Sequence, residues 1–135
     1  MIKVSDLKDG DIIEVEYEGS RSRGEVLQVD KGHKMAKVLT HEQQENWYAE
    51  ADMHACPLND AALSDLHFNK QVNEDGTVKY MKGAFRMLLS RANDFDAFQI
   101  WYREDRRQIQ GPLCLHQLQN HYLDMTKVHL TAAAI

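Results

Sequence analysis

The stretch DIIEVEYEG, from Asp11 to Gly19, alternates apolar and acidic side chains. In an extended chain Ile13, Val15 and Tyr17 fall on one face, and the glutamates that follow each of them fall on the other face. A period of two is typical of a β-strand with one buried face. This stretch therefore predicts a half-buried strand at the start of the chain.

Similar short runs follow it. Residues 24–30 (GEVLQVD) place Val26 and Val29 inward, residues 34–40 read KMAKVLT, and residues 46–58 read NWYAEADMHACPL. The segments SRSRG, KGH and HEQQE separate these runs as turns or loops. Several short strands with turn signals between them favour a barrel or sandwich over βαβ units. We expect five strands between residues 11 and 56, and a five-stranded SH3-like barrel over residues 1–57.

Residues 9–39 also resemble the KOW-type version of this barrel, which occurs in ribosomal and transcription proteins. The resemblance depends on the segment GEVLQV after a turn. It implies that any RNA contacts come from basic loops, and here Arg21 and Arg23 in the predicted first turn are the matching residues. It supports the barrel more than it supports a nucleic-acid function.

The segment CPLNDAALSDLHF marks the boundary between two halves. Asn59 is a good N-cap, Asp60 suits the positive end of a helix dipole, and Leu58 with Leu63 forms a hydrophobic-staple pair. We predict a short linking helix from Asp60 to about Leu66. It begins a second α+β lobe, residues 58–135, which we expect to pack on the barrel as one unit.

An antiparallel meander follows the helix. The Asp75-Gly76 pair predicts a hairpin, and the runs AFRMLLS and DAFQIWYRE each alternate apolar and polar side chains. The inward positions are Phe85, Met87, Leu89, Phe98, Ile100 and Tyr102. The segment REDRRQ is expected to be a polar turn before a last short strand at residues 108–110.

The segment GPLCLHQLQNHYLDMTKVHL, residues 111–130, predicts a helix and a closing strand. Pro112 suits the first helical position. Cys114, Leu115, Leu118 and Tyr122 share one side of this helix and are expected to be buried. The opposite side carries His116, Gln117 and Asn120. In the closing strand, Val128 and Leu130 should point inward.

The segments PLNDAALSDLHF and LHQLQNHYLDMTKVHL resemble a family of uncharacterised small proteins from gut bacteria and their phages or mobile elements. In that family a short β-barrel precedes a helix, a meander and a C-terminal helix reading HQLQN. Asn59 stands where the family usually has threonine, and the tail TAAAI is an extension of the pattern. The resemblance implies no known activity, cofactor or catalytic residue.

Charge and composition limit the function further. The net charge is −5: residues 1–58 carry seven Lys/Arg against twelve Asp/Glu, whereas residues 59–135 carry nine of each. An acidic first half disfavours broad binding to a phosphate backbone, which needs a basic stripe. The charged start MIKVSDLKDG is unlike a signal peptide, and two cysteines fit a reducing compartment. We therefore expect a cytoplasmic protein without a membrane segment.

The sequence contains no recognisable catalytic or phosphate-binding motif. Cys114 with His121, and His54 with Cys56, do not provide the three or four ligands of a zinc site in a recognisable spacing. We therefore expect no catalytic residue, no metal and no cofactor. An enzyme whose site is assembled from distant residues stays as an alternative.

The preferred hypothesis is a small protein-interaction or structural module of a bacterial or phage accessory system, with an unknown protein partner or self-association. Trp47 and Tyr48 are consecutive, so only one should face the core. The other, with Tyr17 or Trp101, would form an exposed aromatic patch. The alternative is nucleic-acid binding, less favoured by net charge, through five arginines: Arg21, Arg23, Arg103, Arg106 and Arg107.

Overall fold

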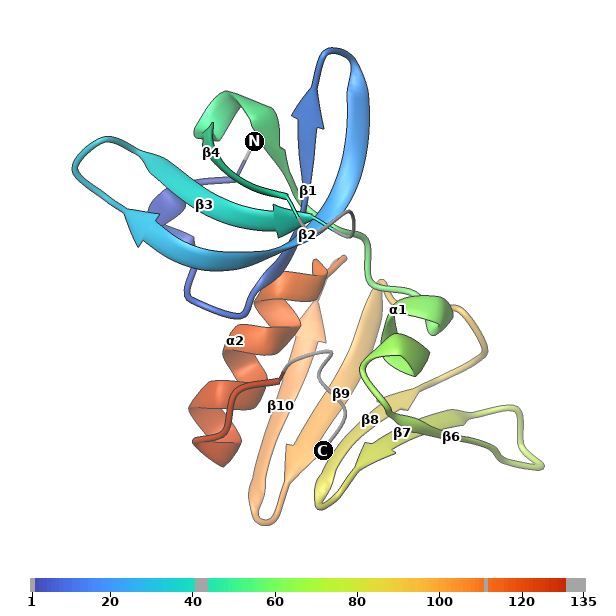
Figure 1. Cartoon of the computed structure of the whole chain (residues 1–135). Coiled ribbons are helices and arrows are strands. Elements are labelled where there is room, and N and C mark those ends of the chain that lie inside the picture. Colours follow the sequence, from blue (N-terminus) through green and yellow to red (C-terminus); the bar gives the residue numbers. More distant parts are fainter. Residues whose placement is uncertain (1, 41–43, 111, 131–135) are drawn as a thin grey trace. The chain divides into compact units, whose positions relative to one another are not determined.

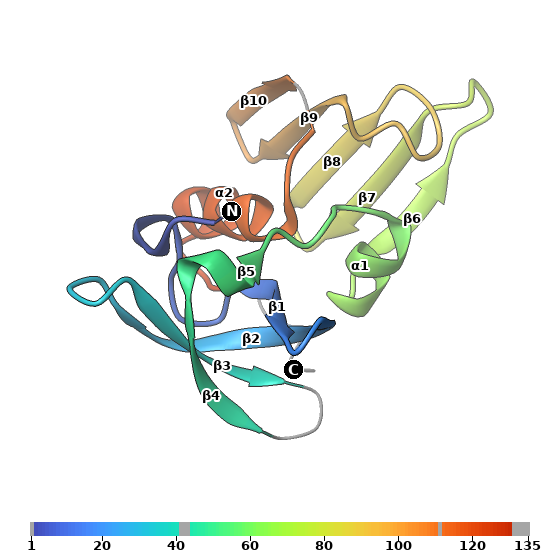
Figure 2. The same cartoon turned by 90° about the horizontal axis from the view of Figure 1, so that it is seen from above.

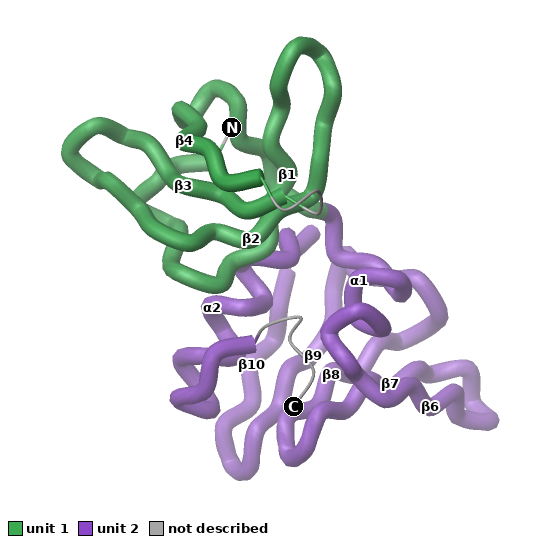
Figure 3. The backbone as a smooth tube through the Cα atoms, viewed as in Figure 1, with its two compact units in different colours: residues 1–56 green, residues 57–135 purple. Residues whose placement is uncertain are grey.

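The computed structural model describes residues 2–40, 44–110 and 112–130 of the chain. The chain divides into two compact units, Met1–Cys56 and Pro57–Ile135, which Figure 3 colours separately. Each unit contains one antiparallel sheet of five strands. The prediction of a mainly β, α+β protein is therefore confirmed.

The first unit is a meander whose last strand returns to the first. Its sheet has the order β4-β3-β2-β1-β5, and all four pairings are antiparallel. Single 3₁₀ turns, Val4–Asp6 and Glu50–Asp52, precede β1 and β5. The strands are β1 (Ile12–Tyr17), β2 (Ser20–Asp30), β3 (Met35–Thr40), β4 (Glu45–Ala49) and β5 (Met53–His54).

The predicted turn at SRSRG is wrong, because these residues form the first half of β2. The turn consists of Glu18 and Gly19, which both have positive φ angles, 51° and 80°. Two consecutive residues with positive φ form the type of tight turn whose twist matches that of a hairpin. Arg21 and Arg23 therefore lie on a strand, paired with residues of β1, and not in a basic loop.

The core of the first unit lies on the inward face of this sheet. Val15 and Val26 are 1% exposed, as the alternation predicts, and Val29 packs against the core from its edge. Tyr17 is 69% exposed and does not join the core. Its strand continues past the last buried side chain, so strand alternation alone could not reveal the difference.

The second unit has a sheet with the order β10-β9-β8-β7-β6, in which every strand pairs with its neighbour along the chain. Its two helices, α1 (Asp60–Asp65) and α2 (Leu115–Thr126), lie on the same side of the sheet in Figures 1 and 2. The strands are β6 (Asn69–Val72), β7 (Val78–Lys82), β8 (Phe85–Leu89), β9 (Ala97–Tyr102) and β10 (Asp105–Gln110).

Most of the predicted meander is confirmed. Five of the six predicted inward side chains are at most 2% exposed: Phe85, Met87, Leu89, Phe98 and Ile100. The rings of Phe85 and Tyr122 meet edge-on at 4.8 Å, which fixes α2 on this face. The last strand begins at Asp105 and not at residue 108, because the turn before it is only two residues long.

The linking helix forms as predicted. Asn59 accepts a hydrogen bond from the Ala62 amide at 2.8 Å through its side-chain oxygen. Leu58 and Leu63 are both buried, at 7% and 0% exposure. The tyrosine hydroxyl of Tyr80 donates to the carboxylate of Asp60 at 2.7 Å, which holds the first turn of α1 to β7.

The C-terminal segment departs from its prediction in three ways. The helix begins at Leu115 with Cys114 as its N-cap, so Pro112 lies outside it. His116, expected on the polar side, is 5% exposed. Residues 127–130 are not a strand: Lys127 adopts φ +64° at the end of α2, and Val128 is 54% exposed.

Side-chain hydrogen bonds explain the missing strand. The Thr126 hydroxyl donates its one proton to the Tyr122 carbonyl at 2.7 Å, lies 3.3 Å from the Val128 carbonyl, and accepts from the Val128 amide at 3.1 Å. These bonds satisfy groups that a strand would need for pairing. Leu130 is buried nonetheless, and the Gln119 side chain donates to its carbonyl at 2.7 Å.

Candidate functional site

A groove in the first unit brings together two of the three predicted binding residues. It has a volume of about 670 Å³, and its lining includes Tyr17, Trp47 and Tyr48. The remaining lining residues are mostly polar: Val15, Glu16, Ser20, Ser22, Thr40, Gln44, Asn46 and Asp52. Three aromatic residues from β1 and β4 therefore border one polar floor.

Strand register explains why the groove lies there. Ser22 pairs with Val15, and Ser20 pairs with Tyr17, so these hydroxyls share the inward face of the sheet. Asn46 pairs with Val38 in the same way. The inward face thus continues beyond the apolar core with side chains too small and too polar to fill it, and the groove results.

The two consecutive aromatic residues point to opposite faces. Tyr48 pairs with the buried Ala36 and packs against the core, whereas Trp47 pairs with Lys37 and is 43% exposed. The prediction that only one of them faces the core is confirmed. Tyr17, at the far end of β1, is the other exposed aromatic side chain of this unit.

The groove is acidic. Glu16 and Asp52 line it, and no lysine or arginine is among the described residues that do so. Glu16 lies 3.3 Å from the Arg21 guanidinium and 3.7 Å from His54, measured between nitrogen and oxygen. Exposed ion pairs of this kind contribute little stability.

Trp101 and the five predicted arginines do not form one site. Trp101, Arg103, Arg106 and Arg107 belong to the second unit, whereas Arg21 and Arg23 belong to the first. Arg23 donates to the buried Cys56 sulfur at 3.3 Å. Arg106 and Arg107 are neighbours on β10, so their side chains point to opposite faces of the sheet.

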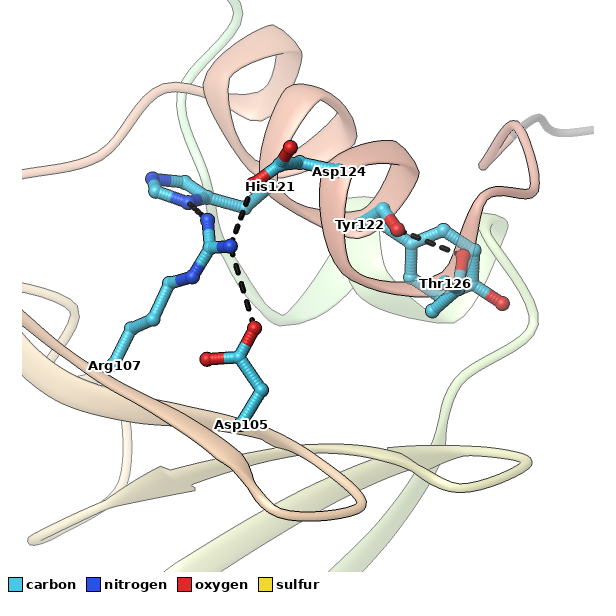
Figure 4. Close-up of polar contacts among 6 residues, drawn as sticks. All are labelled: Asp105, Arg107, His121, Tyr122, Asp124 and Thr126. Carbon is cyan, nitrogen blue, oxygen red and sulfur yellow. Dashed lines mark hydrogen bonds and ion pairs between the residues drawn. The ribbon is translucent and has the colours of Figure 1, made fainter.

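Arg107 is the centre of a polar cluster between β10 and α2, shown in Figure 4. Its guanidinium lies 2.5 Å from the Asp124 carboxylate, 3.4 Å from Asp105 and 3.1 Å from Nδ1 of His121. Since the guanidinium can only donate, Nδ1 of His121 accepts, and the ring proton is on Nε2. A shallow pocket of about 340 Å³ adjoins this cluster.

The residues of this cluster shift one another's pKa values. Burial, and then the charge of Arg107, lower the pKa of His121 from its usual value. The hydrogen bond from Arg107 lowers the pKa of Asp124, and that carboxylate raises the pKa of Arg107 in turn. The guanidinium of Arg107 thus donates to acceptors on both β10 and α2, and these bonds link the strand to the helix.

The Cys114 thiol does not have the character of an activated nucleophile. Burial raises the pKa of the Cys114 thiol, whereas a nucleophilic cysteine needs a lowered one. No disulfide joins Cys56 and Cys114. Among the described residues, no three histidine, cysteine or acidic side chains form a group that could hold a metal ion.

Comparison of the chain with models of protein families, with curated proteins and with solved structures finds no match. Within the described ranges, no helix has the length and apolar character needed to cross a membrane.

The sequence pointed to the aromatic residues of the groove but not to its polar floor. Ser20, Ser22 and Asn46 look like ordinary loop residues when the segment SRSRG is taken as a turn. The signal that would have found them is the period of two, which runs from Val26 back through Gly24 to Ser22 and Ser20.

Proposed function

We propose that the chain is a protein-interaction module, and that its first unit is an SH3-like barrel that binds an extended peptide. The observation that carries the proposal is the groove bordered by Tyr17, Trp47 and Tyr48. Aromatic-lined grooves recognise extended, proline-rich peptides, whose preformed conformation loses little entropy on binding.

Strand order supports the barrel. Four strands form a meander, the fifth pairs back onto β1 through Val15 and Met53, and a 3₁₀ turn immediately precedes the fifth strand. This order brings the hairpin of β1 and β2 and the strand β4 to the two sides of the same concave face. Small barrels bind their ligands at loops and strand ends in such a position.

The acidic lining defines the class of peptide. Glu16 and Asp52 favour a cationic side chain in the bound segment, and the neighbouring aromatic rings favour apolar or proline residues beside it. A basic, proline-containing peptide satisfies both requirements.

The test is isothermal titration calorimetry with synthetic proline-rich peptides that carry arginine, each matched by a version with glutamate in place of arginine. We expect the basic peptides to bind in the micromolar range, and Tyr17→Ala and Trp47→Ala to weaken binding about tenfold, as loss of an interface aromatic does. Both side chains are exposed, so the melting temperature should change little.

Val72→Ala is the matched control, because Val72 is an apolar side chain of the second unit that is 65% exposed, close to the 69% of Tyr17. Equal affinity for the arginine and glutamate peptides, or equal loss of binding in all three variants, would contradict the proposal.

A further inference from the structure

The side of the second sheet that faces away from its helices carries a distinctive set of side chains. Strand register aligns them in two rows, one residue from each strand. We call these ten residues the outer face: Asn69, Met81, Arg86, Trp101 and Arg106 in one row, and Gln71, Lys79, Leu88, Gln99 and Gln108 in the other. Each is exposed or half-buried, whereas the opposite side of the sheet is the core.

The outer face has three cations and no carboxylate. Several basic side chains elsewhere in the described ranges form ion pairs, as Arg21 does with Glu16, Lys70 with Asp60 and Arg107 with Asp124. Over residues 2–40, 44–110 and 112–130, no ion pair joins Lys79, Arg86 or Arg106 to an acidic residue. This is a surface of uncompensated positive charge on a chain whose net charge is −5.

The two arginines are held in place by Trp101. The Arg86 guanidinium carbon lies 4.5 Å from the centre of the indole ring, and that of Arg106 lies 3.9 Å from it. They come from the strands on the two sides of β9, in register with Trp101. The indole N–H donates to the carbonyl of Arg103 at 3.0 Å, which fixes the ring.

Stacking on an aromatic ring orients a guanidinium without using its N–H groups. The arginine forks therefore stay available for an oxyanion, and less side-chain entropy is lost when one binds. Nε of Arg86 is buried without a hydrogen-bond partner among the described residues.

We propose that the outer face binds single-stranded nucleic acid. Its chemistry matches each part of that ligand: Lys79, Arg86 and Arg106 for phosphates, and the amides of Asn69, Gln71, Gln99 and Gln108 for base edges. Guanidinium planes and the apolar Leu88 and Met81 offer stacking and contact surface for unpaired bases. The four amides favour a nucleic acid over an acidic protein as the ligand. A surface that binds a carboxylate-rich protein would carry further cations in the place of these amides.

The dimensions of the face agree with this ligand. Five strands about 4.8 Å apart span roughly 19 Å. Sheets of similar width bind two or three bases of a single strand on their open face. A five-stranded face does not fit into a groove of duplex DNA, which admits a helix or a two-stranded ribbon.

This assignment differs from the one that the sequence suggested. Of the five arginines named there, only Arg106 belongs to the outer face, and no motif in the sequence singles out Arg86 or Lys79. The two rows form only when the register of all five strands is known. The net charge of −5 does not oppose this ligand, because the acidic excess lies in residues 1–58 and residues 59–135 have a net charge of zero.

The test is fluorescence anisotropy of the full chain with a labelled, mixed-sequence single-stranded oligonucleotide, RNA and DNA in parallel. With three phosphate contacts, log affinity should fall against log salt with a slope of about −2, which is roughly a twentyfold loss between 50 and 200 mM salt. We expect a labelled duplex of the same sequence to bind more weakly.

Two single variants test the residues. Arg106→Gln and Arg86→Gln should each weaken binding about tenfold and reduce the salt slope by about 0.7. Arg106 is exposed, so its variant reports on binding even if Arg86→Gln is unstable. Arg91→Gln is the matched control. Arg91 is an exposed arginine of the same unit outside the outer face, and its substitution removes the same charge.

Three results would each overturn the proposal. The first is that the parent does not bind the oligonucleotide at 50 mM salt, and the second is that Arg91→Gln weakens binding as much as Arg106→Gln. The third is that polyglutamate displaces the labelled oligonucleotide as effectively as the unlabelled oligonucleotide does. The first result would show that the outer face does not bind single-stranded nucleic acid. The second would show that the loss of binding follows net charge alone, and the third would assign the outer face to an acidic protein.

Discussion

His121 is the residue whose role the structure changes most. In the sequence it is one of three histidines in a polar segment, where its only candidate role is that of a metal ligand. The structure makes it an acceptor for Arg107, in a cluster completed by Asp105 and Asp124. Protonation of Nδ1 would replace that hydrogen bond with two adjacent cations.

The stability of the protein should therefore depend on the protonation of His121. The pKa of this ring is lower in the folded chain than its usual 6.5, so the unfolded chain takes up the proton first. The stabilisation is complete above pH 6.5 and is lost as the pH falls from there through the lower, folded pKa. Asp124 titrates well below this window, because its pKa is lowered from 3.8.

We expect the free energy of unfolding of the parent, measured by urea denaturation, to fall more between pH 7 and pH 5 than that of His121→Gln. His129→Gln is the control, because it removes an exposed imidazole that is not part of the Arg107 cluster. Identical pH profiles for all three proteins would show that His121 titrates normally.

Strand β2 contributes both to the core and to the groove of the first unit. It runs for eleven residues, and its first half supplies the floor of the groove while its second half supplies the core. Between the two halves, Gly24 lies against β3. A Cβ atom at Gly24 would be 2.4 Å from Cγ1 of Val38 and 3.0 Å from the carbonyl oxygen of Leu39.

Gly24→Ala should therefore push β2 away from β3. Overpacking of this kind costs about 1–3 kcal/mol, which a guanidinium denaturation curve would detect as a lower midpoint. A Cβ atom at Gly32 would have its nearest neighbour 3.5 Å away, in a side chain, so Gly32→Ala is the matched control and should be nearly neutral. A midpoint for Gly24→Ala equal to that of the control would contradict the steric argument.

The two proposed sites lie in different units and have opposite charge. The groove of the first unit carries Glu16 and Asp52, whereas the outer face of the second unit carries Lys79, Arg86 and Arg106. A peptide that is basic and a nucleic acid that is anionic have no common chemistry. One chain would thus bind two ligands of different classes.

Separate ligands predict separable losses. Tyr17→Ala should weaken the basic peptide about tenfold and leave the affinity for the oligonucleotide unchanged. Arg106→Gln should have the reverse effect. Calorimetry and anisotropy on the same two variants would check this, and a variant that weakens both ligands equally would show that the two sites are not independent.

Local patterns determined much of this protein. Period-two alternation predicted most of the strands because each of these has one apolar face. Asn59 predicted the start of α1 because an N-cap acts within four residues. The Trp47-Tyr48 pair predicted that one ring faces the core and the other is exposed. Where local chemistry competes, the same patterns failed: Thr126 turns the chain away from the predicted final strand, and the turn forms at Glu18 and Gly19 in place of SRSRG.

Only the tertiary structure decided which side chains meet. The groove needs the register of β1, β2 and β4, and the row from Asn69 to Arg106 needs the register of five strands at once. A shift of one residue in any pairing would turn every side chain of a strand to its other face. Sequence alternation states that two faces exist, but the pairing of distant strands determines what each face presents.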